Sequence, residues 1–192
     1  MKKVYFTHIE KDFDRALAAI FEKEGYRVVT EAEDNIDVFI DTTDTFVAAD
    51  DKAVGEGIEI EAAAEAYRKN VCEPLMKLEE VLPRMTGCKR ICFLNGSYAS
   101  VNACEATSGY GHNMAKAALN QIMTITKNGL IEKGYTFRLF DPMDGRIEAK
   151  KAAACAYVYF TRDRFHDGPD NRFRQDERNL VVRDALGREI PW

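Results

Sequence analysis

Two residues near the middle of the chain have side chains that could transfer protons. His112 and Lys116 stand in the stretch SGYGHNMAKAAL (108–119), and residues four apart lie on one face of a helix. An imidazole exchanges protons near neutral pH, and a neighbouring ammonium favours its neutral form, which suits a base. This pair makes the predicted helix a candidate site of acid/base chemistry.

The elements that must position this pair alternate between strand-like and helical patterns. Short β-rich runs predict strands at 2–7, 27–30, 36–41, 89–97, 135–142 and from 179 onward. Helical spacing of apolar residues predicts helices at 12–26, 60–85, 112–134 and 147–160. Strands that alternate with helices need right-handed crossovers and form a mostly parallel sheet covered on both faces. The sequence thus predicts an α/β fold, a doubly wound parallel sheet in one domain spanning 1–192.

Local signals predict where these helices begin, bend and end. Asp12 is expected to cap the first helix, and Gly25 lies where that helix should stop. Pro74 is expected to kink the 60–85 helix, because a proline inside a helix removes a backbone hydrogen bond. Tyr110 is expected to precede the 112–134 helix and so to lie away from the face that carries Lys116.

Composition narrows the classes of function. The chain has 192 residues, of which 46% are hydrophobic and 31% charged, with a net charge of −5. Basic and acidic residues are interspersed, so there is no electrostatic reason to expect nucleic acid or an anionic membrane as a partner. No signal-peptide pattern is found, and no apolar run approaches the ~18 residues of a membrane span. A cytoplasmic location is predicted.

The metal-ligating residue types form no strong pattern. The five cysteines include no CxxC pair and are expected to be reduced, mostly buried thiols. His8 and His112 could share a metal ion with Asp41 or Asp44, but no ligand spacing demands it. No metal site is predicted.

Several segments resemble one known family, in the same order along the chain. VYFTHIEKDFDRALAAIFEKEGYRVV (4–29) is similar to the first strand, cofactor turn and first helix of the short-chain dehydrogenases/reductases. IDVFIDTTD (36–44) resembles the family's strand that ends in Asn-Asn-Ala-Gly. HNMAKAALNQ (112–121) resembles the helix with the Tyr-x-x-x-Lys pair, and FRLFDPMDG (137–145) the strand that ends in Pro-Gly. The resemblance implies a Rossmann-like three-layer sandwich, oxidoreductase activity and NAD or NADP as cofactor.

The resemblance also implies which residues would form a catalytic site. The family uses a tyrosine as acid or base, together with a lysine, a serine and an asparagine. Lys116 matches the lysine and Asn70 the asparagine, while the serine position falls on Ser97 or Tyr98, depending on one alignment step. His112 stands where the tyrosine would stand. Two interpretations stay open: the histidine marks lost chemistry, or it serves as a different acid or base.

The cofactor turn departs from the family's pattern. That pattern is Thr-Gly-x-x-x-Gly-x-Gly, whose glycines let the backbone approach the pyrophosphate. Thr7 is the one residue of the motif kept here, as a weak candidate for cofactor binding. The glycine positions hold residues with side chains, namely His8, Asp12 and Asp14. Acidic side chains near a helix N-terminus repel a phosphate, so we expect no dinucleotide cofactor.

Chain length points the same way. Only residues 30–35 join the second and third predicted strands, where a family member has a helix, a strand and another helix. One βαβ unit needs about 30 residues. The sheet should therefore lack part of one half, the part that forms the adenosine pocket in the family.

These departures predict a non-catalytic subunit or scaffold, a pseudoenzyme with degraded dinucleotide and catalytic motifs. Its partner would be a second copy or a related full-length subunit, joined through the 60–85 and 112–134 helices that the family commonly pairs into a four-helix interface. Three alternatives remain. They are a divergent oxidoreductase using NAD or NADP, a cofactor-free acid/base enzyme using His112 and Lys116, and a binder of a small ligand in the emptied cleft.

The C-terminal part gives two further expectations. Arginines and acids alternate between Thr161 and Arg178, which predicts a salt-bridged surface loop. Trp192 is the only tryptophan, and it is expected to dock in the chain's own core or in a partner.

Overall fold

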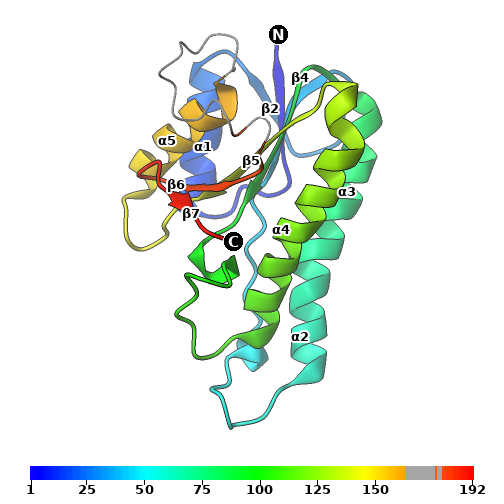
Figure 1. Ribbon diagram of the computed structural model, residues 1–192. Helices are drawn as coiled ribbons and strands as arrows, with labels where there is room; N and C mark the ends of the chain where they lie inside the picture. The colour runs from blue at the N-terminus through cyan, green and yellow to red at the C-terminus, as the bar shows by residue number, and fades with distance from the viewer. Residues whose placement is uncertain (163–175, 177–178) are drawn as a thin grey trace.

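The computed structural model describes residues 1–162, 176 and 179–192 and builds them around one sheet (Figure 1). The strands are β1 (Lys3–Phe6), β2 (Arg27–Val29), β3 (Ile36–Asp41), β4 (Met85–Leu94), β5 (Thr136–Asp141), β6 (Val182–Asp184) and β7 (Glu189–Ile190). The helices are α1 (Asp12–Lys23), α2 (Ile60–Tyr67), α3 (Glu73–Val81), α4 (Tyr110–Leu130) and α5 (Ala149–Thr161).

The strand order in the sheet is β2-β1-β3-β4-β5-β6-β7. Every neighbouring pair is parallel except β6 and β7, which are antiparallel. The order reverses at β1, which lies between β2 and β3, and this reversal defines a doubly wound sheet. The predicted fold class is confirmed.

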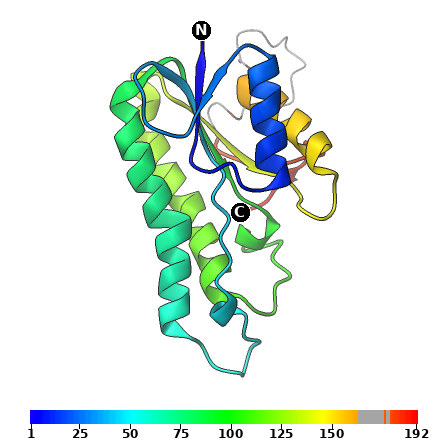
Figure 2. The ribbon, with the colours of Figure 1, turned by 180° about the vertical axis from the view of Figure 1, so that it is seen from behind.

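Helices cover both faces of the sheet and make it the middle of three layers (Figures 1 and 2). On one face α1 and α5 pack together over a core that includes Phe6, Phe21 and Phe140. On the other face α3 and α4 cover a core that includes Phe39, Leu78 and Leu119. Most of β3 and the second half of β4 (91–94) are buried, as expected for strands covered on both faces, whereas residues 86–88 at the start of β4 are exposed.

One end of the sheet is short, as the length of the chain predicts. Strand β2 forms that edge, and only residues 30–35 separate it from β3. Among the described residues no further strand pairs with β2. The missing part of the sheet half is therefore confirmed, and β2 is left as an edge of three residues.

Three expectations about helix limits need correction. The N-cap of α1 is Lys11 rather than Asp12, because the Asp14 carboxylate already accepts the backbone N–H groups there. Tyr110 is the first residue of α4 rather than a residue before it. Instead of a kink at Pro74, a π-helical turn over 68–72 precedes the proline and keeps α2 and α3 nearly in line.

Burial differs from expectation at the cysteines and at the C-terminus. Only Cys92 is buried, so the prediction of mostly buried thiols is wrong: the free and exposed cysteines are Cys72, Cys88, Cys104 and Cys155. Trp192 is 40% exposed, and so it is not docked in the chain's own core. Its backbone carbonyl accepts a hydrogen bond from the Asn102 side chain at 2.6 Å.

The predicted loop between Thr161 and Arg178 lies almost wholly outside the described residues. Its described member Asp176 is buried, where its carboxylate accepts hydrogen bonds from the Tyr159 hydroxyl and the Arg183 guanidinium. This contact ties α5 to β6. In the part of the chain that the structure describes, no helix is both long and apolar enough to cross a bilayer.

Candidate functional site

Strands β1, β3 and β4 are neighbours inside the sheet, and their carboxyl ends lie together next to the point where the strand order reverses. In open α/β sheets ligands bind in this crevice. The segments that leave these strands here are 7–11, 42–47 and 95–99, and the start of α4 closes the crevice from the side. The site is therefore assembled from four stretches that are far apart in the sequence.

The carboxylate of Asp44 lies at the centre of this site. Its Oδ1 atom is 2.8 Å from His112 Nε2, 3.3 Å from the Tyr98 hydroxyl and 3.8 Å from Lys116 Nζ. Its Oδ2 atom is 3.0 Å from Lys11 Nζ. One internal carboxylate thus meets donors from α4, from the turn after β4 and from the start of α1.

These donors fix the ionisation of Asp44. Burial by itself raises the pKa of a carboxyl group, but here the hydrogen bond from His112 and the charges of Lys116 and Lys11 outweigh it. The pKa of Asp44 therefore lies well below its usual range, and the group is ionised throughout the neutral range. Because an ionised carboxylate only accepts hydrogen bonds, His112 carries a proton on Nε2.

Lys116 is fully buried and is held by backbone groups. Its Nζ donates to the Thr43 carbonyl at 2.6 Å and to the Leu94 carbonyl at 3.1 Å. Burial lowers the pKa of this lysine, while Asp44 and Asp41 act in the opposite direction. The ammonium therefore ties the ends of β3 and β4 together and places little of its hydrogen-bonding capacity toward solvent.

His112 and Tyr98 share an aromatic corner beside Asp44. Their ring centroids are 5.0 Å apart, and the centroid of the Phe46 ring lies 5.8 Å from that of the imidazole. His112 is only 8% exposed, so it is buried although it lies near a helix end. Burial, followed by the charge of Asp44, raises the pKa of the Tyr98 hydroxyl well above its usual value, so this hydroxyl stays protonated and donates.

Of the two residues at the predicted serine position, Tyr98 is the one that reaches the site. Its ring folds back over Gly96, where an added Cβ would lie 2.6 Å from the tyrosine ring. A side chain at position 96 would therefore displace the Tyr98 ring. The backbone N–H of Ser97 hydrogen-bonds the Asp141 carboxylate, which positions the turn after β4.

The start of α4 is held by a carboxylate from another segment. Both oxygens of the buried Asp50 accept backbone N–H groups at 2.8 Å, from Gly111 and from His112. These are N–H groups that a helix start leaves without an internal partner. An added Cβ on Gly111 would lie 2.4 Å from the Ala63 Cα, so the glycine permits α2 and α4 to touch. Asp50 and Gly111 together place His112.

Asn70 and Thr7 have structural partners. The Asn70 side chain is fully buried in the π-helical turn and brackets Thr45, accepting its N–H and donating to its carbonyl. The Thr7 hydroxyl donates to Asp41 at 2.8 Å and accepts the Thr42 N–H. Both residues thus fix the backbone on either side of Asp44.

The turn between β1 and α1 holds a second internal carboxylate. Asp14 Oδ2 accepts the N–H groups of Glu10 and Lys11, at 3.1 and 2.9 Å. Its Oδ1 atom is buried, and among the described residues it has no hydrogen-bond partner. Burial raises the pKa of Asp14, although the two backbone hydrogen bonds act against this shift.

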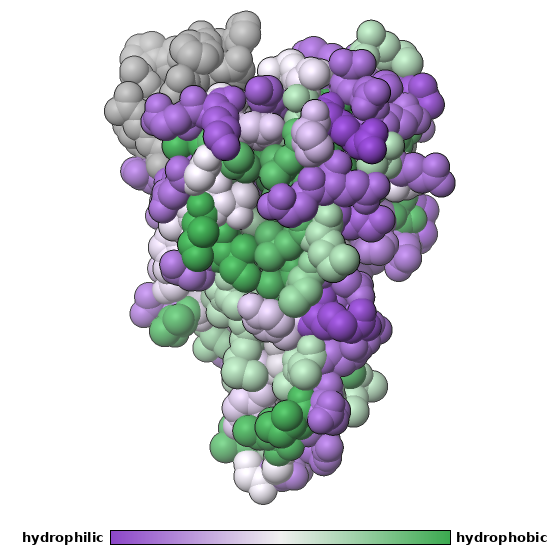
Figure 3. Space-filling model, turned by 90° about the vertical axis from the view of Figure 1, so that its right-hand side faces the viewer, coloured by the Kyte–Doolittle hydropathy of each residue, from purple (hydrophilic) through white to green (hydrophobic). Residues whose placement is uncertain are grey.

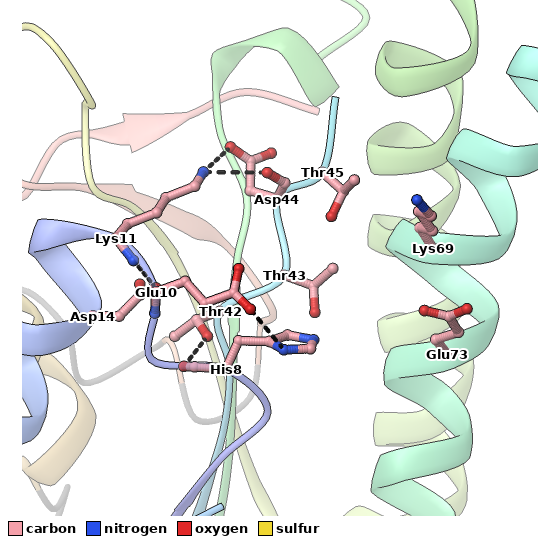
Figure 4. A pocket seen from close by; sticks show the side chains of 10 residues that line it. All are labelled: His8, Glu10, Lys11, Asp14, Thr42, Thr43, Asp44, Thr45, Lys69 and Glu73. Atoms are coloured by element: carbon pink, nitrogen blue, oxygen red, sulfur yellow. Dashed lines mark hydrogen bonds and ion pairs between the residues drawn. The ribbon is translucent and has the colours of Figure 1, made fainter. Parts of the chain in front are cut away.

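A pocket of about 210 Å³ lies between this turn and the helix layer (Figure 4). His8, Asp44 and Thr45 line it from the sheet side, and Lys69 and Glu73 line it from across the gap. His8 is about half exposed, and the carboxylate near its ring is that of Glu10, 3.9 Å away. In the described part of the chain no group of three His, Cys, Asp or Glu side chains could hold a metal ion.

The structure brings His112, Lys116 and Tyr98 together around Asp44, whereas Asn70 and Ser97 lie in supporting positions. Nothing in the sequence pattern predicts that Lys11 and Asp50 hold this group, and the sequence indicates Asp44 only as a possible metal ligand. The signal available was the polar run DTTD (41–44) directly after a buried strand, at the edge where ligands bind. The contacts of Lys11 and Asp50 bridge 33 or more residues along the chain, so no local pattern indicates them.

Comparison with solved structures identifies the fold. The chain is similar to a Burkholderia multivorans protein assigned as a short-chain alcohol dehydrogenase, with a TM-score of 0.77, 14% identity and coverage of 100% of this chain and 99% of that one. It is also similar to a carbonyl reductase of Pseudomonas aeruginosa PAO1 in complex with NADP, with a TM-score of 0.74, 16% identity and full coverage of both chains. The protein Sniffer of Caenorhabditis elegans, assigned as a carbonyl reductase, gives a TM-score of 0.73 at 11% identity and covers 99% of this chain and 98% of its own.

These likenesses show that the chain has the fold of the short-chain dehydrogenases/reductases, as its sequence predicts. No family model and no curated protein matches the sequence. The fold is therefore shared while the sequence has diverged far from these structures.

Proposed function

We propose that this chain is a short-chain-dehydrogenase-like protein that has given up dinucleotide chemistry and serves as a non-catalytic subunit or scaffold. One observation carries the proposal: the Asp44 carboxylate lies within 4 Å of His112, Tyr98, Lys116 and Lys11. By the resemblance, the first three stand at positions that would face a substrate and a cofactor ribose. The Asp44 carboxylate occupies the space that these residues face and so competes with both the substrate and the cofactor ribose.

The cofactor turn supports the same proposal. Backbone N–H groups at a helix start are the usual ligands of a pyrophosphate. Here the N–H groups of Glu10 and Lys11 already bond the buried Asp14 carboxylate. A bound phosphate would have to displace that carboxylate or lie against its charge. The bare edge at β2 also removes a wall against which an adenine ring would pack.

The test is a fluorescence titration of the purified protein with NADH and with NADPH. We expect no saturable change up to millimolar cofactor, with an active short-chain dehydrogenase as the positive control. Binding in the micromolar range would overturn the proposal and restore the alternative, a divergent oxidoreductase that uses NAD or NADP.

The exposed face of α4 supports a role in assembly (Figure 3). Met114 is 55% exposed and Ile125 is 61% exposed, and Ala118 and Gln121 lie between them at helical spacing. No charged residue interrupts this stripe, whereas the outer face of α2 and α3 carries many charges. Figure 3 views this side of the molecule and shows apolar and hydrophilic residues segregated across it. We propose that α2, α3 and α4, within the predicted 60–85 and 112–134 helices, pair with a second copy or a related subunit.

The assembly is tested by light scattering on the wild type and on Ile125→Glu. We expect the wild type to be at least dimeric and Ile125→Glu to dissociate at micromolar concentration. Lys151→Glu, a change at an exposed residue of α5 on the other face of the sheet, serves as the matched control and should leave the dimer intact. A wild type that is monomeric at high concentration contradicts self-assembly. Co-purification with a longer relative then tests whether the partner is a related subunit.

One observation favours a second candidate, an acid/base enzyme that needs no cofactor. The 2.8 Å contact between His112 Nε2 and an ionised Asp44 is the arrangement that orients a catalytic imidazole. The other ring nitrogen, Nδ1, would then exchange the proton. Under this candidate His112→Gln abolishes any activity found in the purified protein, while Lys116 acts only by holding the backbone.

A further inference from the structure

The groups around Asp44 have the composition of a carboxylate-recognition site. Two ammonium groups, one imidazole N–H and one phenol converge on a single carboxylate, and each of its oxygens has at least one charged partner. Hydrogen bonds from charged donors to a carboxylate are among the strongest in proteins. The contacts of Asp44 thus show that the surrounding donors can bind a carboxylate.

Two of these donors, Lys116 and His112, are also held by groups other than the Asp44 carboxylate. Lys116 is anchored by the carbonyls of Thr43 and Leu94, and the start of α4 that carries His112 is anchored by Asp50. The backbone that follows Asp44 is clamped by Asn70 through both the N–H and the carbonyl of Thr45. Removing or turning the Asp44 side chain therefore leaves Lys116, the start of α4 and the backbone after Asp44 anchored.

The Asp44 side chain also has space into which it can turn. It lines the pocket of about 210 Å³ that opens toward Thr45 and Lys69, and the side chain is 24% exposed. Because the side chain borders this space, its carboxylate can leave the donors by rotation about the Cα–Cβ bond while the clamped backbone stays in place. A carboxylate from another molecule could therefore take the position of the Asp44 carboxylate.

We propose that Lys11, Tyr98, His112 and Lys116 form a binding site for a small carboxylic acid, which the Asp44 side chain occupies in this structure. The inference deepens the proposed function and rests on it, because the site is open to such a ligand only if a dinucleotide does not fill it. The ligand's carboxylate takes the position of the Asp44 carboxylate, and the rest of the ligand extends into the adjoining pocket.

Competition sets the affinity of this site. A tethered carboxylate acts as a competitor at an effective concentration on the order of millimolar or higher. A simple acid such as formate or acetate therefore binds the wild type poorly. Removing the tethered group removes the competitor and leaves a cationic hole of about the same size.

The test compares wild type and Asp44→Ala in titrations with sodium formate and sodium acetate. Ionic strength is held constant with sodium chloride, and the midpoint of thermal unfolding, Tm, is measured. We expect the Tm of Asp44→Ala to rise saturably with either acid, with half-saturation in the millimolar range. The wild type should need at least tenfold more acid for the same rise. Asp144→Ala, a change at an exposed acid near Lys11, is the matched control and should behave as the wild type does.

A second variant ties the effect to the site. Adding Lys11→Met to Asp44→Ala should weaken the response to formate at least tenfold. Equal responses to formate and chloride, or equal responses of Asp44→Ala and wild type, would overturn the inference. If Asp44→Ala does not fold, Asp44→Ser takes its place in the same titration.

The outcome is separable from that of the cofactor titration. NADH binding to the wild type overturns the proposed function, and this inference with it, even if Asp44→Ala responds to carboxylates. No carboxylate response together with no NADH binding overturns this inference only.

Discussion

Asp44 and Asp14 carry carboxylates where the family resemblance predicts a nucleotide, and these two carboxylates are held very differently. Asp44 has hydrogen bonds from Lys11, Tyr98 and His112 and an ion pair with Lys116, and its pKa lies below the usual range. Asp14 has two backbone N–H donors, one oxygen without a partner among the described residues, and a raised pKa. The first carboxylate contributes to folding as an anion, whereas ionisation of the second opposes folding.

The two carboxylates differ in how far their partners compensate for burial. A buried charge is tolerated when its partners replace the hydration it loses, and it is costly when they do not. The surroundings of Asp44 meet that condition and those of Asp14 meet it only in part. If the proposed function holds, the crevice around Asp44 is adapted to an internal anion, whereas Asp14 only fills the turn between β1 and α1.

Asp44→Ala is expected to cause the largest loss of stability. It leaves two buried or half-buried ammonium groups and one imidazole N–H without their common acceptor, and breaking a buried ion pair in this way costs about 3 kcal/mol or more. Urea unfolding at pH 7 measures the change. The control Asp144→Ala removes a half-exposed carboxylate and should change stability by less than ~0.5 kcal/mol. Equal effects of the two changes would contradict the special role of Asp44.

Gly111→Ala is expected to have the next largest effect. The new Cβ would meet the Ala63 backbone at 2.4 Å, so α2 and α4 must separate, at a cost of about 1–3 kcal/mol. Gly129→Ala lies on the same helix with nothing within 4 Å and should stabilise the protein by up to ~1 kcal/mol. Denaturant unfolding of both variants measures the two changes in stability. If both substitutions stabilise or both destabilise the protein, this explanation is refuted.

Lowering the pH should change the contributions of Asp44 and Asp14 to folding stability in opposite directions. Asp44 has a folded-state pKa below the unfolded value of about 3.9, so its stabilisation is present above that pH and is lost as pH falls toward the folded value. Asp14 has a raised folded-state pKa, so protonation in the folded state makes stability rise as pH falls through that value. The stability difference between wild type and Asp44→Asn should therefore shrink between about pH 4 and pH 2. A difference that is constant with pH would show that Asp44 does not act through its charge.

Asp14→Asn is expected to have the smallest effect. The amide oxygen can keep accepting the N–H groups of Glu10 and Lys11, and the cost of ionising a buried group disappears. Against this, the amide NH₂ lacks an acceptor, so the net change at pH 7 should be within about 1 kcal/mol. Thermal unfolding measures it. A loss as large as that of Asp44→Ala would abolish the distinction between the two carboxylates.

The sequence by itself predicted the order of the elements and the class of fold. Alternating strand and helix patterns were sufficient because helix period, strand period and crossover handedness are local or topological properties. The short segment 30–35 likewise predicted the bare edge at β2, since a missing unit is a matter of chain length. His112 and Lys116 could be paired because four residues make about one helical turn.

The tertiary structure decided what the site contains. Whether Ser97 or Tyr98 enters it depends on how the turn folds over Gly96, and the role of Asn70 depends on its clamp around Thr45. The meeting of Lys11, Asp44 and His112 closes loops of 33 and 68 residues, and only the packed sheet and helices bring such distant groups together. The sequence shows which side chains can carry a charge, whereas their burial and their neighbours in the folded protein determine whether they are ionised.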